Sequence, residues 1–398
     1  MLPRPAHTPE GTGRLTAAGL DAVQRLEIMA GDDEPVLLFY YKPVPGNPFQ
    51  ALLYAACWEQ GIAPVPVPDL GSLDELRELL QLTDHVVLHL HWTGPLTAGA
   101  RDEDEARRRT QDLLQRLEHH RDAGGRIVWT VHNARPHDCP HPDVDLSLRR
   151  ELVRLADVVH VLSEATMSAT RRVGYELPPE RIVSIPHPNY VTAYPRFSDH
   201  QAARADAGLH PTAHVIGAIG AIRPYKRIPA LLDAFEPLLH DRGPSRPQLL
   251  VAGDGADHAL RDRVDRHPGA IGIFEPLEPT RLVDLVRACD VIALPYRDVL
   301  NSGALMLALS CGRPAVAPAV GTLTDFADEP SVTLFDPRDP GDLTLALRDA
   351  LASARSEGIR ASALTVAERF DPEVVARRFA EAIRKLVTDV DQRAPTDS

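Results

Sequence analysis

Short apolar runs alternate with longer amphipathic segments along the first half of the chain. Each run has the length of one strand, and each segment between two runs repeats its apolar residues with the period of a helix. The predicted strands are Val36–Tyr41, Ile62–Val67, His85–His91, Arg126–His132, Val158–Leu162 and Arg181–Pro186. The predicted helices are Leu20–Met29, Phe49–Gln60, Leu73–Leu82, Glu105–Ala123 and Leu148–Ala156. This alternation predicts βαβ units and a parallel sheet with helices on both faces.

The alternation stops in the middle of the chain and then starts again. A Pro- and Tyr-rich stretch, Pro186–Pro195, and a polar stretch, Arg196–Gly208, predict a linker. The strands predicted after it are His214–Ile219, Gln248–Ala252, Ala270–Phe274, Val291–Leu294, Pro314–Ala317 and Val332–Leu334. The last predicted elements are the helices Leu343–Ser356, Ile359–Arg369 and Pro372–Val387, followed by a disordered tail, Asp389–Ser398.

The chain is therefore expected to form two α/β domains, and 398 residues are too many for a single core. We predict two Rossmann-like domains that face each other across a cleft, the first formed by residues 1–195 and the second by residues 196–370. The first roughly 30 residues are expected to be flexible. Residues 371–398 are predicted to form a helix that packs back towards the N-terminal domain, and then the tail. Ligands of open parallel sheets bind at the carboxyl ends of the strands, so the cleft is the expected site.

Composition and charge narrow the class of protein and its partners. Hydrophobic residues make up 44% of the chain and charged residues 25%, which is typical of a soluble globular protein. No apolar run approaches the roughly 18–20 residues that span a bilayer, and the N-terminus lacks the apolar core of a signal peptide. These features predict a cytoplasmic protein. The net charge of −13 disfavours nucleic acid as a partner. The cationic run Arg107–Arg109 lies among acidic residues, which indicates a solvated helix face.

The cysteines and histidines give little indication of a metal. The four cysteines are far apart and form no CxxC pair, so neither a zinc ribbon nor a disulfide framework is indicated. The segment His137–His141 contains residue types that bind metals, but a Pro-punctuated loop that happens to be rich in His explains it too. Because no second ligand cluster accompanies this segment, we expect neither a metal nor another cofactor.

The stretch Val215–Arg227, VIGAIGAIRPYKR, predicts a buried strand and a turn of small residues, and the helix Pro229–Leu239 follows. The small residues Gly217, Gly220 and Ala221 lie along the strand and turn, and the cations Arg223 and Lys226 come just before the helix. Small residues let backbone amides approach a ligand, and the helix dipole and the cations favour an anion there. The stretch is therefore either a site for a phosphate or diphosphate or an ordinary strand-to-helix turn with solvated cations.

A second helix of the same domain also begins with small residues. Asn301, Ser302 and Gly303 open the predicted helix Ala304–Ser310, and their amides would be accessible to a diphosphate. A simple Asn or Ser cap is the alternative. We favour binding, because two helix N-termini of one domain would then point into the same cleft.

Four segments of the C-terminal half follow one another in the order found in a known family. They are IGAIRPYKRIPALLDAF (219–235), LLVAGDG (249–255), LVDLVRACDVIALPY (282–296) and SGALMLALSCGRPAVAP (302–318). In this order they resemble the nucleotide-sugar-binding domain of GT-B glycosyltransferases, particularly the GT4-like (group 1) family. The resemblance implies the GT-B architecture and a nucleotide-sugar donor whose base lies near Phe274–Leu277. The donor contacts it implies are Gly220, Ala221, Arg223, Lys226, Phe274, Glu275, Leu277, Asn301, Ser302 and Gly303.

The chain departs from the family pattern at two places. The paired glutamates of the family would fall near Val299 and Leu307, and neither residue is acidic. Asp298 is the candidate replacement for the first glutamate, which normally engages the sugar hydroxyls. The arginine usual after the first glycine is Ala221 here, with Arg223 as its candidate substitute, whereas Lys226 keeps its expected place.

Polar residues at the ends of two strands of the N-terminal half are candidates for the acceptor side. The predicted acceptor contacts are Asn47, His91, Trp92 and Asn133. Asn47 could instead belong to a rigid PGNP turn, and His89, inside its strand, is better explained as a buried structural histidine. The family also carries a histidine near the end of the second strand, which favours a functional role for His132. Ser163, Glu164 and His187 are further candidates.

These observations predict the transfer of a sugar from a nucleotide-diphosphate-sugar to a hydroxyl acceptor such as a small molecule, a saccharide or a peptide. The predicted catalytic residues are His132, Arg223, Lys226 and Asp298. The resemblance implies a metal-independent and retaining reaction, and an inverting one would need a base such as His132. Two alternatives stay open. One is a phosphorylase or epimerase on the same fold, and the other is an inactive nucleotide-sugar-binding partner of another glycosyltransferase, which the missing glutamates suggest.

Overall fold

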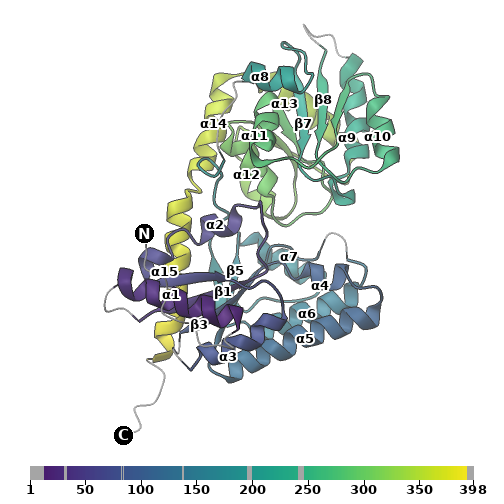
Figure 1. Ribbon diagram of the computed structural model, residues 1–398. Helices are drawn as coiled ribbons and strands as arrows, with labels where there is room; N and C mark the ends of the chain where they lie inside the picture. Colours follow the sequence, from purple (N-terminus) through teal and green to yellow (C-terminus); the bar gives the residue numbers. More distant parts are fainter. Residues whose placement is uncertain are drawn as a thin grey trace. The chain divides into compact units, whose positions relative to one another are not determined.

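The computed structural model describes residues 13–30, 34–81, 83, 85–136, 139–194, 200–240 and 246–391. The chain folds into two compact units (Figure 1). Unit 1 consists of residues 1–186 and 372–398, and unit 2 consists of residues 187–371. The sequence predicts a boundary between residues 195 and 196, which lie outside the described residues. The division of the structure falls earlier in the chain, after residue 186.

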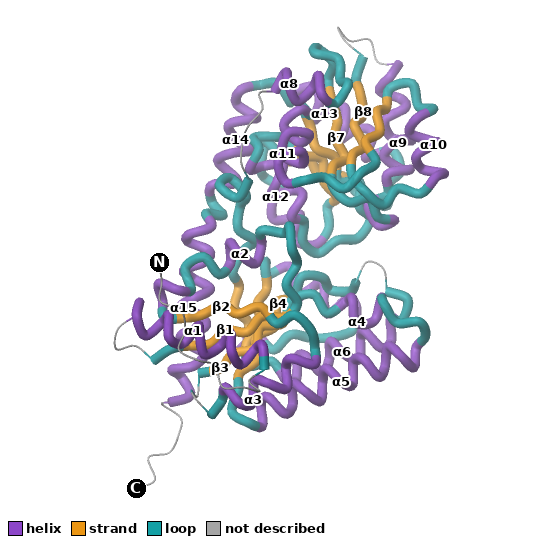
Figure 2. The backbone as a smooth tube through the Cα atoms, viewed as in Figure 1, coloured by secondary structure: helices purple, strands orange, loops and turns teal. Residues whose placement is uncertain are grey.

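Unit 1 contains a parallel sheet of six strands (Figure 2). The strands are β1 (Val36–Tyr41), β2 (Ile62–Pro66), β3 (Val86–Leu90), β4 (Arg126–Thr130), β5 (Val158–Val161) and β6 (Ile182–Ser184). They lie in the order β2-β1-β3-β4-β5-β6. The chain therefore builds the sheet outward from β1 in one direction to β2 and in the other direction from β3 onward. The carboxyl ends of β1 and β3 flank the point where the direction changes, which is where sheets of this kind bind ligands.

Helices of unit 1 cover both faces of this sheet. They are α1 (Arg14–Ala30), α2 (Phe49–Leu53), η1 (Trp58–Gln60), η2 (Gly71–Glu75), α3 (Leu76–Leu79), α4 (Gly94–Ala98), α5 (Glu103–Asp122), α6 (Pro142–Leu155), α7 (Ala165–Val173), η3 (Pro179–Arg181) and α15 (Pro372–Asp391). The predicted helix Phe49–Gln60 is wrong in its length, because α2 ends at Leu53 and turns separate it from η1.

The C-terminal helix α15 packs within unit 1. Its residues Val375, Phe379 and Ile383 share one apolar cluster with residues of β1 and α2. The Arg384 guanidinium donates hydrogen bonds to the main-chain oxygens of Gln60 and Glu34, at 2.6 and 2.8 Å. The helix continues to Asp391, past the predicted start of the tail, and residues 392–398 lie outside the described residues.

Unit 2 contains a second parallel sheet of six strands. The strands are β7 (Val215–Ile219), β8 (Gln248–Ala252), β9 (Ala270–Ile273), β10 (Val291–Ala293), β11 (Ala315–Pro318) and β12 (Val332–Phe335). They lie in the order β12-β11-β10-β7-β8-β9, which places the first strand of the unit, β7, beside the fourth, β10. This is the strand order of the doubly wound dinucleotide-binding fold, with its switch point between β7 and β10.

The sheet of unit 2 is also covered on both faces. The helices are α8 (His200–Asp206), η4 (Pro224–Lys226), α9 (Ile228–Phe235), η5 (Glu236–His240), α10 (His258–Asp265), α11 (Pro279–Ala288), α12 (Gly303–Ser310), η6 (Gly321–Phe326), α13 (Asp342–Ser353) and α14 (Glu357–Glu368). Residues of α9 and α13 share one apolar cluster with β7 and β8. On the other face the Sγ of Cys289 would lie 2.4 Å from a β-carbon at Gly217, so only glycine fits there.

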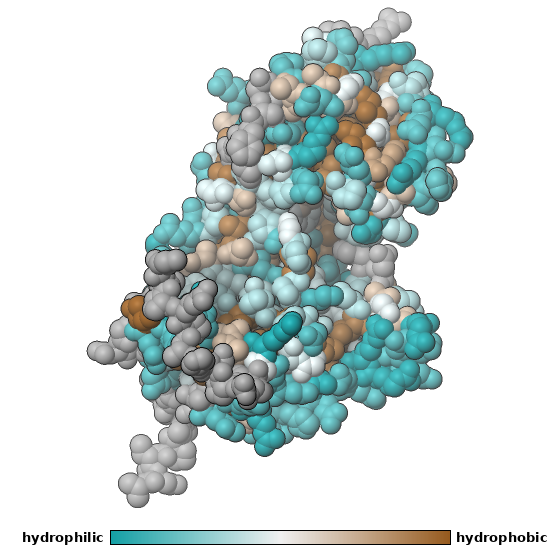
Figure 3. All heavy atoms as spheres, in the orientation of Figure 1, coloured by the Kyte–Doolittle hydropathy of each residue, from teal (hydrophilic) through white to brown (hydrophobic). Residues whose placement is uncertain are grey.

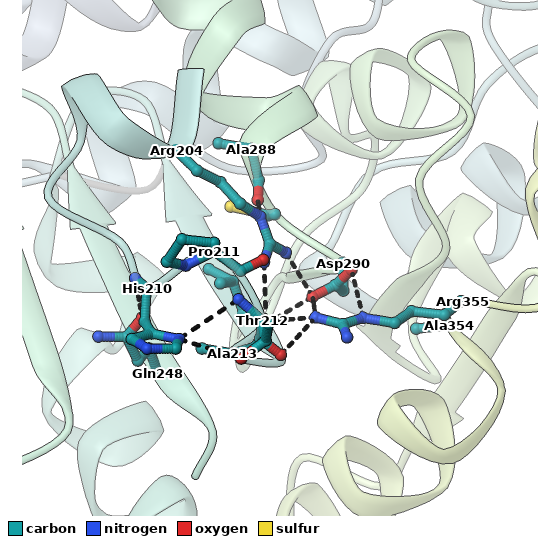
Figure 4. A network of polar contacts seen from close by, with 12 residues as sticks. Arg204, His210, Pro211, Thr212, Ala213, Gln248, Ala288, Asp290, Ala354 and Arg355 are labelled. Carbon is teal, nitrogen blue, oxygen red and sulfur yellow. Dashed lines mark hydrogen bonds and ion pairs between the residues drawn. The ribbon is translucent and has the colours of Figure 1, made fainter. Parts of the chain in front are cut away.

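A buried ionic network joins the amino ends of β7 and β10 (Figure 4). The Asp290 carboxylate accepts hydrogen bonds from the Val215 amide at 2.9 Å and from the Arg204 guanidinium at 2.7 Å. Arg355 and Arg360 also donate to it, at 3.2 and 3.3 Å. Hydrogen bonds from Arg355 and Val215, together with the positive charge of Arg204, hold the pKa of Asp290 below its ordinary value despite its burial.

The same network corrects the predicted linker. Arg204 belongs to α8, which forms inside the stretch Arg196–Gly208, and its side chain is 1% exposed. Besides the Asp290 carboxylate, it binds the main-chain oxygens of Pro211, Ala213 and Ala288. Arg204 therefore anchors α8 within unit 2, whereas Gln201 and Asp206 of the same helix are exposed.

The surface over α5 and α6 is strongly hydrophilic (Figure 3). On α5, Arg107 pairs with Glu103 and Arg109 pairs with Glu105, one helical turn away in each case. The cationic run is therefore the solvated helix face that the sequence predicts. Among the residues that the structure describes, no helix is both long enough and apolar enough to cross a membrane.

Candidate functional site

Two turns of unit 2 meet at the carboxyl edge of its sheet, at the switch point between β7 and β10. The first turn, residues 220–227, follows β7, and the second, residues 294–302, follows β10 and leads into α12. The rings of Tyr225 and Tyr296 join the two turns, with their centroids 5.5 Å apart. The structure therefore brings together the two segments that the sequence selected as diphosphate contacts.

Glycines allow the turn after β7 to pack against the turn after β8. Gly220 has φ 100°, and its amide donates a hydrogen bond to the Ala252 oxygen at 2.8 Å. A β-carbon at Gly253 would lie 2.3 Å from the Gly220 oxygen, and one at Gly255 would lie 2.6 Å from the Ile222 oxygen. The Ile222 amide in turn donates to the Asp254 oxygen at 2.6 Å. The close packing of two backbones explains why both segments need glycine.

Lys226 is a half-buried cation of this site. Burial, helped by the positive charge of Arg223, lowers the pKa of its ammonium to about 8, whereas Asp254 opposes the shift. The Lys226 Nζ would lie 3.5 Å from a β-carbon at Gly220, so the ammonium reaches back over the start of its own turn. Arg223 is exposed, and its guanidinium lies against Gly255. Ala221 is exposed and provides a small residue beside these cations.

The second turn ends in a capped helix. The Ser302 hydroxyl accepts a hydrogen bond from the Leu305 amide at 3.2 Å, so Ser302 is the N-cap of α12. The Ser302 side chain also hydrogen-bonds Tyr296, while burial raises the pKa of the Tyr296 phenol. Asn301, Ser302 and Gly303 are all half-buried. Capping occupies the hydroxyl and leaves the first amides of α12 as the groups that an anion could contact.

His187 and Tyr190 lie beside the start of α12. A β-carbon at Gly303 would lie 3.2 Å from the Tyr190 hydroxyl and 3.6 Å from the His187 Nε2. The His187 Nδ1 lies 2.7 Å from the Pro188 oxygen, a pure acceptor, so Nδ1 carries the proton and Nε2 accepts from Tyr190 at 3.2 Å. Burial lowers the pKa of His187 to about 4. The sequence selected His187 but gave no signal for Tyr190, whose contact arises only from the fold.

The remaining predicted donor contacts lie in loops at the same edge of the sheet. Glu275 and Asp298 are exposed, and Leu277 is half-buried. Phe274 is also half-buried, and the Arg261 guanidinium lies 5.4 Å from its ring centroid. A β-carbon at Gly272 would lie 2.4 Å from this ring, so the ring folds back over its own strand.

In unit 1, His132 follows β4 and lies in an aromatic setting. The ring of Trp92 stacks on it with centroids 4.0 Å apart and an angle of 16° between the planes. Phe49 meets it edge-on at 5.0 Å. His132 and Trp92 are half-buried, so aromatic packing holds the imidazole while leaving part of it open to solvent.

His132 is one end of a line of hydrogen-bonded side chains that crosses unit 1, which we call the histidine chain. Its members, in spatial order, are His160, Thr130, His89, Tyr54, His91 and His132. His160, Thr130, His89, Tyr54 and His91 are buried. Burial lowers the pKa values of His89 and His91 well below the ordinary value and raises that of Tyr54. His89 is thus the buried structural histidine that the sequence predicts.

The residues of unit 1 that are predicted to contact the acceptor differ in burial and in hydrogen-bond partners. His91 is 2% exposed, and its Nε2 and Nδ1 lie 2.5 Å from the Tyr54 hydroxyl and 3.0 Å from His132. Asn47 accepts a hydrogen bond from the Phe49 amide at 3.0 Å and holds the turn before α2. Asn133 is half-buried, and its main-chain oxygen accepts a hydrogen bond from the Arg149 guanidinium at 2.8 Å. His91 and Asn47 therefore hold neighbouring protein groups, whereas Trp92 and Asn133 are partly accessible.

The histidine-rich segment His137–His141 is described from Cys139 onward. His137 lies outside the described residues, as does Asp138. Within the part of the chain that the structure describes, no group of three or more His, Cys, Asp or Glu residues is arranged to hold a metal ion.

The two units, each with a six-stranded parallel sheet between helices, have the Rossmann-like architecture that the resemblance to GT-B glycosyltransferases predicts. Residues 213–353, which include both turns of the site, match the family model described as glycosyl transferases group 1. This part of the chain is therefore similar to the group 1 glycosyl transferases, the family that the sequence motifs resemble.

Two curated relatives show the extent of the similarity. D-inositol 3-phosphate glycosyltransferase 2 of Catenulispora acidiphila is 30% identical over 265 residues, which cover 64% of this chain and 62% of that protein. GDP-mannose:glycolipid 4-beta-D-mannosyltransferase of Xanthomonas campestris pv. campestris is 28% identical over 71% of this chain and 73% of that protein. The chain thus spans less than two thirds of the length of the first relative.

Solved structures confirm the fold. Sucrose-phosphate synthase from Thermosynechococcus elongatus superposes with a TM-score of 0.67 at 16% identity, over 89% of this chain and 100% of that one. HepE of Anabaena, solved in complex with UDP-glucose, superposes with a TM-score of 0.63 at 17% identity, over 88% of this chain and 100% of that one.

Proposed function

We propose that the chain transfers a sugar from a nucleotide-diphosphate-sugar donor to a hydroxyl group of an acceptor. The observation that carries this proposal is the pairing of the Lys226 turn with the start of α12 at the switch point of unit 2. A half-buried ammonium, a nearby guanidinium and the amides of two turns suit a diphosphate. The names of the relatives support a glycosyl transfer over a phosphorylase or an epimerase.

In the proposed reaction the bond from the anomeric carbon to the donor phosphate breaks, and a bond to the acceptor oxygen forms. The diphosphate leaves with the electron pair of the broken bond, so its negative charge is the main charge to stabilise. Lys226 and Arg223 supply the opposite charge, which makes a metal-independent reaction our proposal. We also propose retention, in which the leaving phosphate takes the proton of the acceptor hydroxyl.

The remaining roles follow from position. Phe274, Glu275 and Leu277 follow β9 and are proposed to hold the base and ribose. Asp298 follows β10 and is proposed to bind the sugar hydroxyls in place of the missing glutamate. In unit 1 we propose that His132, Trp92 and Asn133 contact substrate hydroxyls. The acceptor is proposed to be a small molecule, a saccharide or a peptide.

A thermal-shift panel of UDP-, GDP-, dTDP- and ADP-sugars tests the donor, with released nucleotide diphosphate as the measure of turnover. A ligand that binds the folded state raises the unfolding temperature by mass action. We expect one nucleotide class to raise it and to be turned over, and Lys226→Ala to abolish both effects. Arg266→Ala is the matched control, because Arg266 is a highly exposed cation of the same unit.

The outcomes of this panel separate the alternatives. Stabilisation without turnover of any donor would favour the inactive binding partner. Stabilisation by no nucleotide sugar would overturn the proposed donor site. Turnover abolished by EDTA and restored by a divalent cation would overturn metal independence, and analysis of the anomeric configuration of the product decides between retention and inversion.

Lys226 also makes donor binding depend on pH. The ammonium with a pKa of about 8 loses its charge as the pH rises through that value, so the affinity for UDP should fall between about pH 7.5 and 9.5. The loss can approach about tenfold per pH unit above the pKa while the charged form alone binds well. Calorimetric titration with UDP measures it, and Lys226→Arg should flatten the dependence because arginine stays charged. An affinity for UDP that is constant over this range would contradict the role of Lys226.

A further inference from the structure

The histidine chain is built from residues two positions apart on neighbouring strands. His89 and His91 lie on and just after β3, Thr130 and His132 on and just after β4, and His160 on β5. Alternate residues of a strand share one face of the sheet, so these side chains line up across the strands. Tyr54, which follows α2, enters the line between His89 and His91. Phe379 of α15 stacks on His89 at 5.1 Å and covers the line with an apolar ring.

The first link of the chain has a defined direction. The His160 Nε2 lies 2.9 Å from the main-chain oxygen of Ile185, which can only accept a hydrogen bond. Nε2 of His160 must therefore carry a proton, and in the neutral ring Nδ1 is the acceptor. Thr130 then donates its hydroxyl proton to that Nδ1, 2.9 Å away.

Each hydrogen bond then fixes which group donates in the next one. Since Thr130 has used its proton, its oxygen accepts from the His89 Nε2 at 2.6 Å. His89 is neutral, so its Nδ1 accepts from the Tyr54 hydroxyl at 2.8 Å. The Tyr54 oxygen then accepts from the His91 Nε2 at 2.5 Å.

The last link decides the tautomer of His132. The neutral His91 has its proton on Nε2, so its Nδ1 accepts from the His132 Nε2 at 3.0 Å. Neutral His132 therefore has its proton on Nε2 and its lone pair on Nδ1. Reversing every bond would leave the His160 Nε2 without a proton and place its lone pair against the Ile185 oxygen. A buried polar group without a hydrogen bond is unfavourable, so the chain has one preferred direction.

We propose that the Ile185 oxygen, acting through the histidine chain, sets the tautomer of His132 and so presents its Nδ1 as the hydrogen-bond acceptor for a substrate hydroxyl. His160, Thr130, His89, Tyr54 and His91 are positioning residues in this proposal, since they act on substrate only through His132. The part that concerns substrate rests on the proposed glycosyl transfer, whereas the tautomer is a property of the free protein.

Nitrogen-15 NMR of the histidine-labelled full chain tests the tautomer directly at about pH 8, with the His132 signals assigned by their loss in His132→Gln. We expect the Nε2–H form in the unaltered protein. Thr130→Val keeps the branched shape but removes the hydroxyl, so His132 should become a mixture of both forms. Thr130→Ser returns a hydroxyl and should restore the single form.

A matched control is Thr110→Val in α5. Thr110 is also buried, but its hydroxyl donates to the Ala106 oxygen of its own helix and lies outside the histidine chain. It should leave the His132 signals unchanged. If His132 is the Nδ1–H form in the unaltered protein, or if its tautomer is the same in Thr130→Val, the proposal is overturned.

Kinetics add a second measure once a donor is known. The kcat/KM of transfer should fall in proportion to the fraction of His132 left in the Nε2–H form, so an even mixture lowers it about twofold. Calorimetric binding of UDP to Thr130→Val should match the unaltered protein, because the donor contacts belong to unit 2. If the tautomer changes while kcat/KM stays constant, the proposed contact of His132 with a substrate hydroxyl is overturned. The control of its tautomer by the histidine chain would still stand. If no donor is turned over at all, the proposed function fails while the NMR result still stands.

Discussion

Each unit of this protein buries a polar network, and the two networks differ in charge. The histidine chain of unit 1 consists of imidazoles and hydroxyls, and burial keeps His89 and His91 neutral. The network of unit 2 holds the Asp290 carboxylate among Arg204, Arg355 and Arg360. Every member of the first network can both donate and accept, whereas guanidinium groups only donate and a carboxylate only accepts. In a neutral network, the donor-to-acceptor direction of one hydrogen bond therefore sets that of the next. In an ionic network, each group keeps a fixed role as donor or acceptor.

The two networks also lie at opposite edges of their sheets. Asp290 precedes β10 and binds the first amide of β7, so it joins the amino ends of these strands. His91 and His132 follow β3 and β4, at the carboxyl edge of the other sheet. Since ligands of parallel sheets bind at the carboxyl edge, the ionic network has a structural role and the neutral chain ends where substrates are expected.

The largest effect is expected from Asp290→Asn. It leaves the buried Arg204 guanidinium without a carboxylate, which costs about 3–5 kcal/mol in comparable proteins. All three tryptophans, Trp58, Trp92 and Trp129, belong to unit 1. In urea, an early transition should appear in the far-ultraviolet circular dichroism while the tryptophan fluorescence midpoint stays in place.

Asp233→Asn is the control for this experiment, because Asp233 is a largely exposed member of an ion pair in the same unit. It should change neither signal. If Asp290→Asn moves the fluorescence midpoint as far as the circular dichroism, the network does not act on unit 2 alone.

A smaller effect is expected from pH on the stability of the protein, and the two networks should respond in different pH ranges. The pKa of His89 is lowered by burial, so below about pH 6.5 the unfolded chain binds a proton that the folded one does not. The contribution of neutral His89 to the free energy of unfolding is therefore fully present above that pH. It is lost as the pH falls through the lowered pKa of the folded state. The Asp290 pKa is also lowered, but from the acid range, so its contribution is lost only below about pH 3.9.

His89→Gln should therefore flatten the pH dependence of unit 1 stability between about pH 6.5 and 5. The slope should fall by up to about 1.4 kcal/mol per pH unit, measured from urea unfolding followed by tryptophan fluorescence. His119→Gln, an exposed histidine of the same unit, is the control. An unchanged slope in His89→Gln would show that His89 does not stay neutral in the folded protein.

The smallest effect is expected from Arg355→Gln, at the rim of the ionic network. The Arg355 side chain is 39% exposed, whereas that of Arg204 is 1% exposed. Water screens the outer ion pair, so its loss should cost about 1 kcal/mol or less. Unfolding in urea followed by circular dichroism measures this cost. A loss of stability as large as that of Asp290→Asn would contradict the weaker contribution of the exposed Arg355.

Much of the fold can be predicted from the sequence because the signals are local. The apolar runs placed strands in both units, and the order of small residues and cations in Val215–Arg227 predicted a turn that the structure contains. The start of α12 is predicted to within one residue, at Ala304 where the structure has Gly303, since a capping residue acts within one helical turn.

The prediction failed where the partner of a polar residue is far away in the chain. Arg204 was assigned to a linker because its partner, Asp290, is 86 positions further on. The sequence also did not indicate that His91 hydrogen-bonds Tyr54 and His132, which are 37 and 41 positions away, and its contact with an acceptor stays a prediction. Polarity suggests exposure until the tertiary structure supplies a buried partner.

The sequence by itself determined the two α/β domains, the glycine turn with Lys226 and the resemblance to group 1 glycosyl transferases, because periodicity and short motifs depend on neighbouring residues. Only the tertiary structure decided which polar residues are buried and in which direction their hydrogen bonds run. The reason is physical: a tautomer depends on which atom lies opposite each nitrogen. In unit 1 that choice begins at the Ile185 oxygen and ends at His132, through side chains from three strands and one helix end.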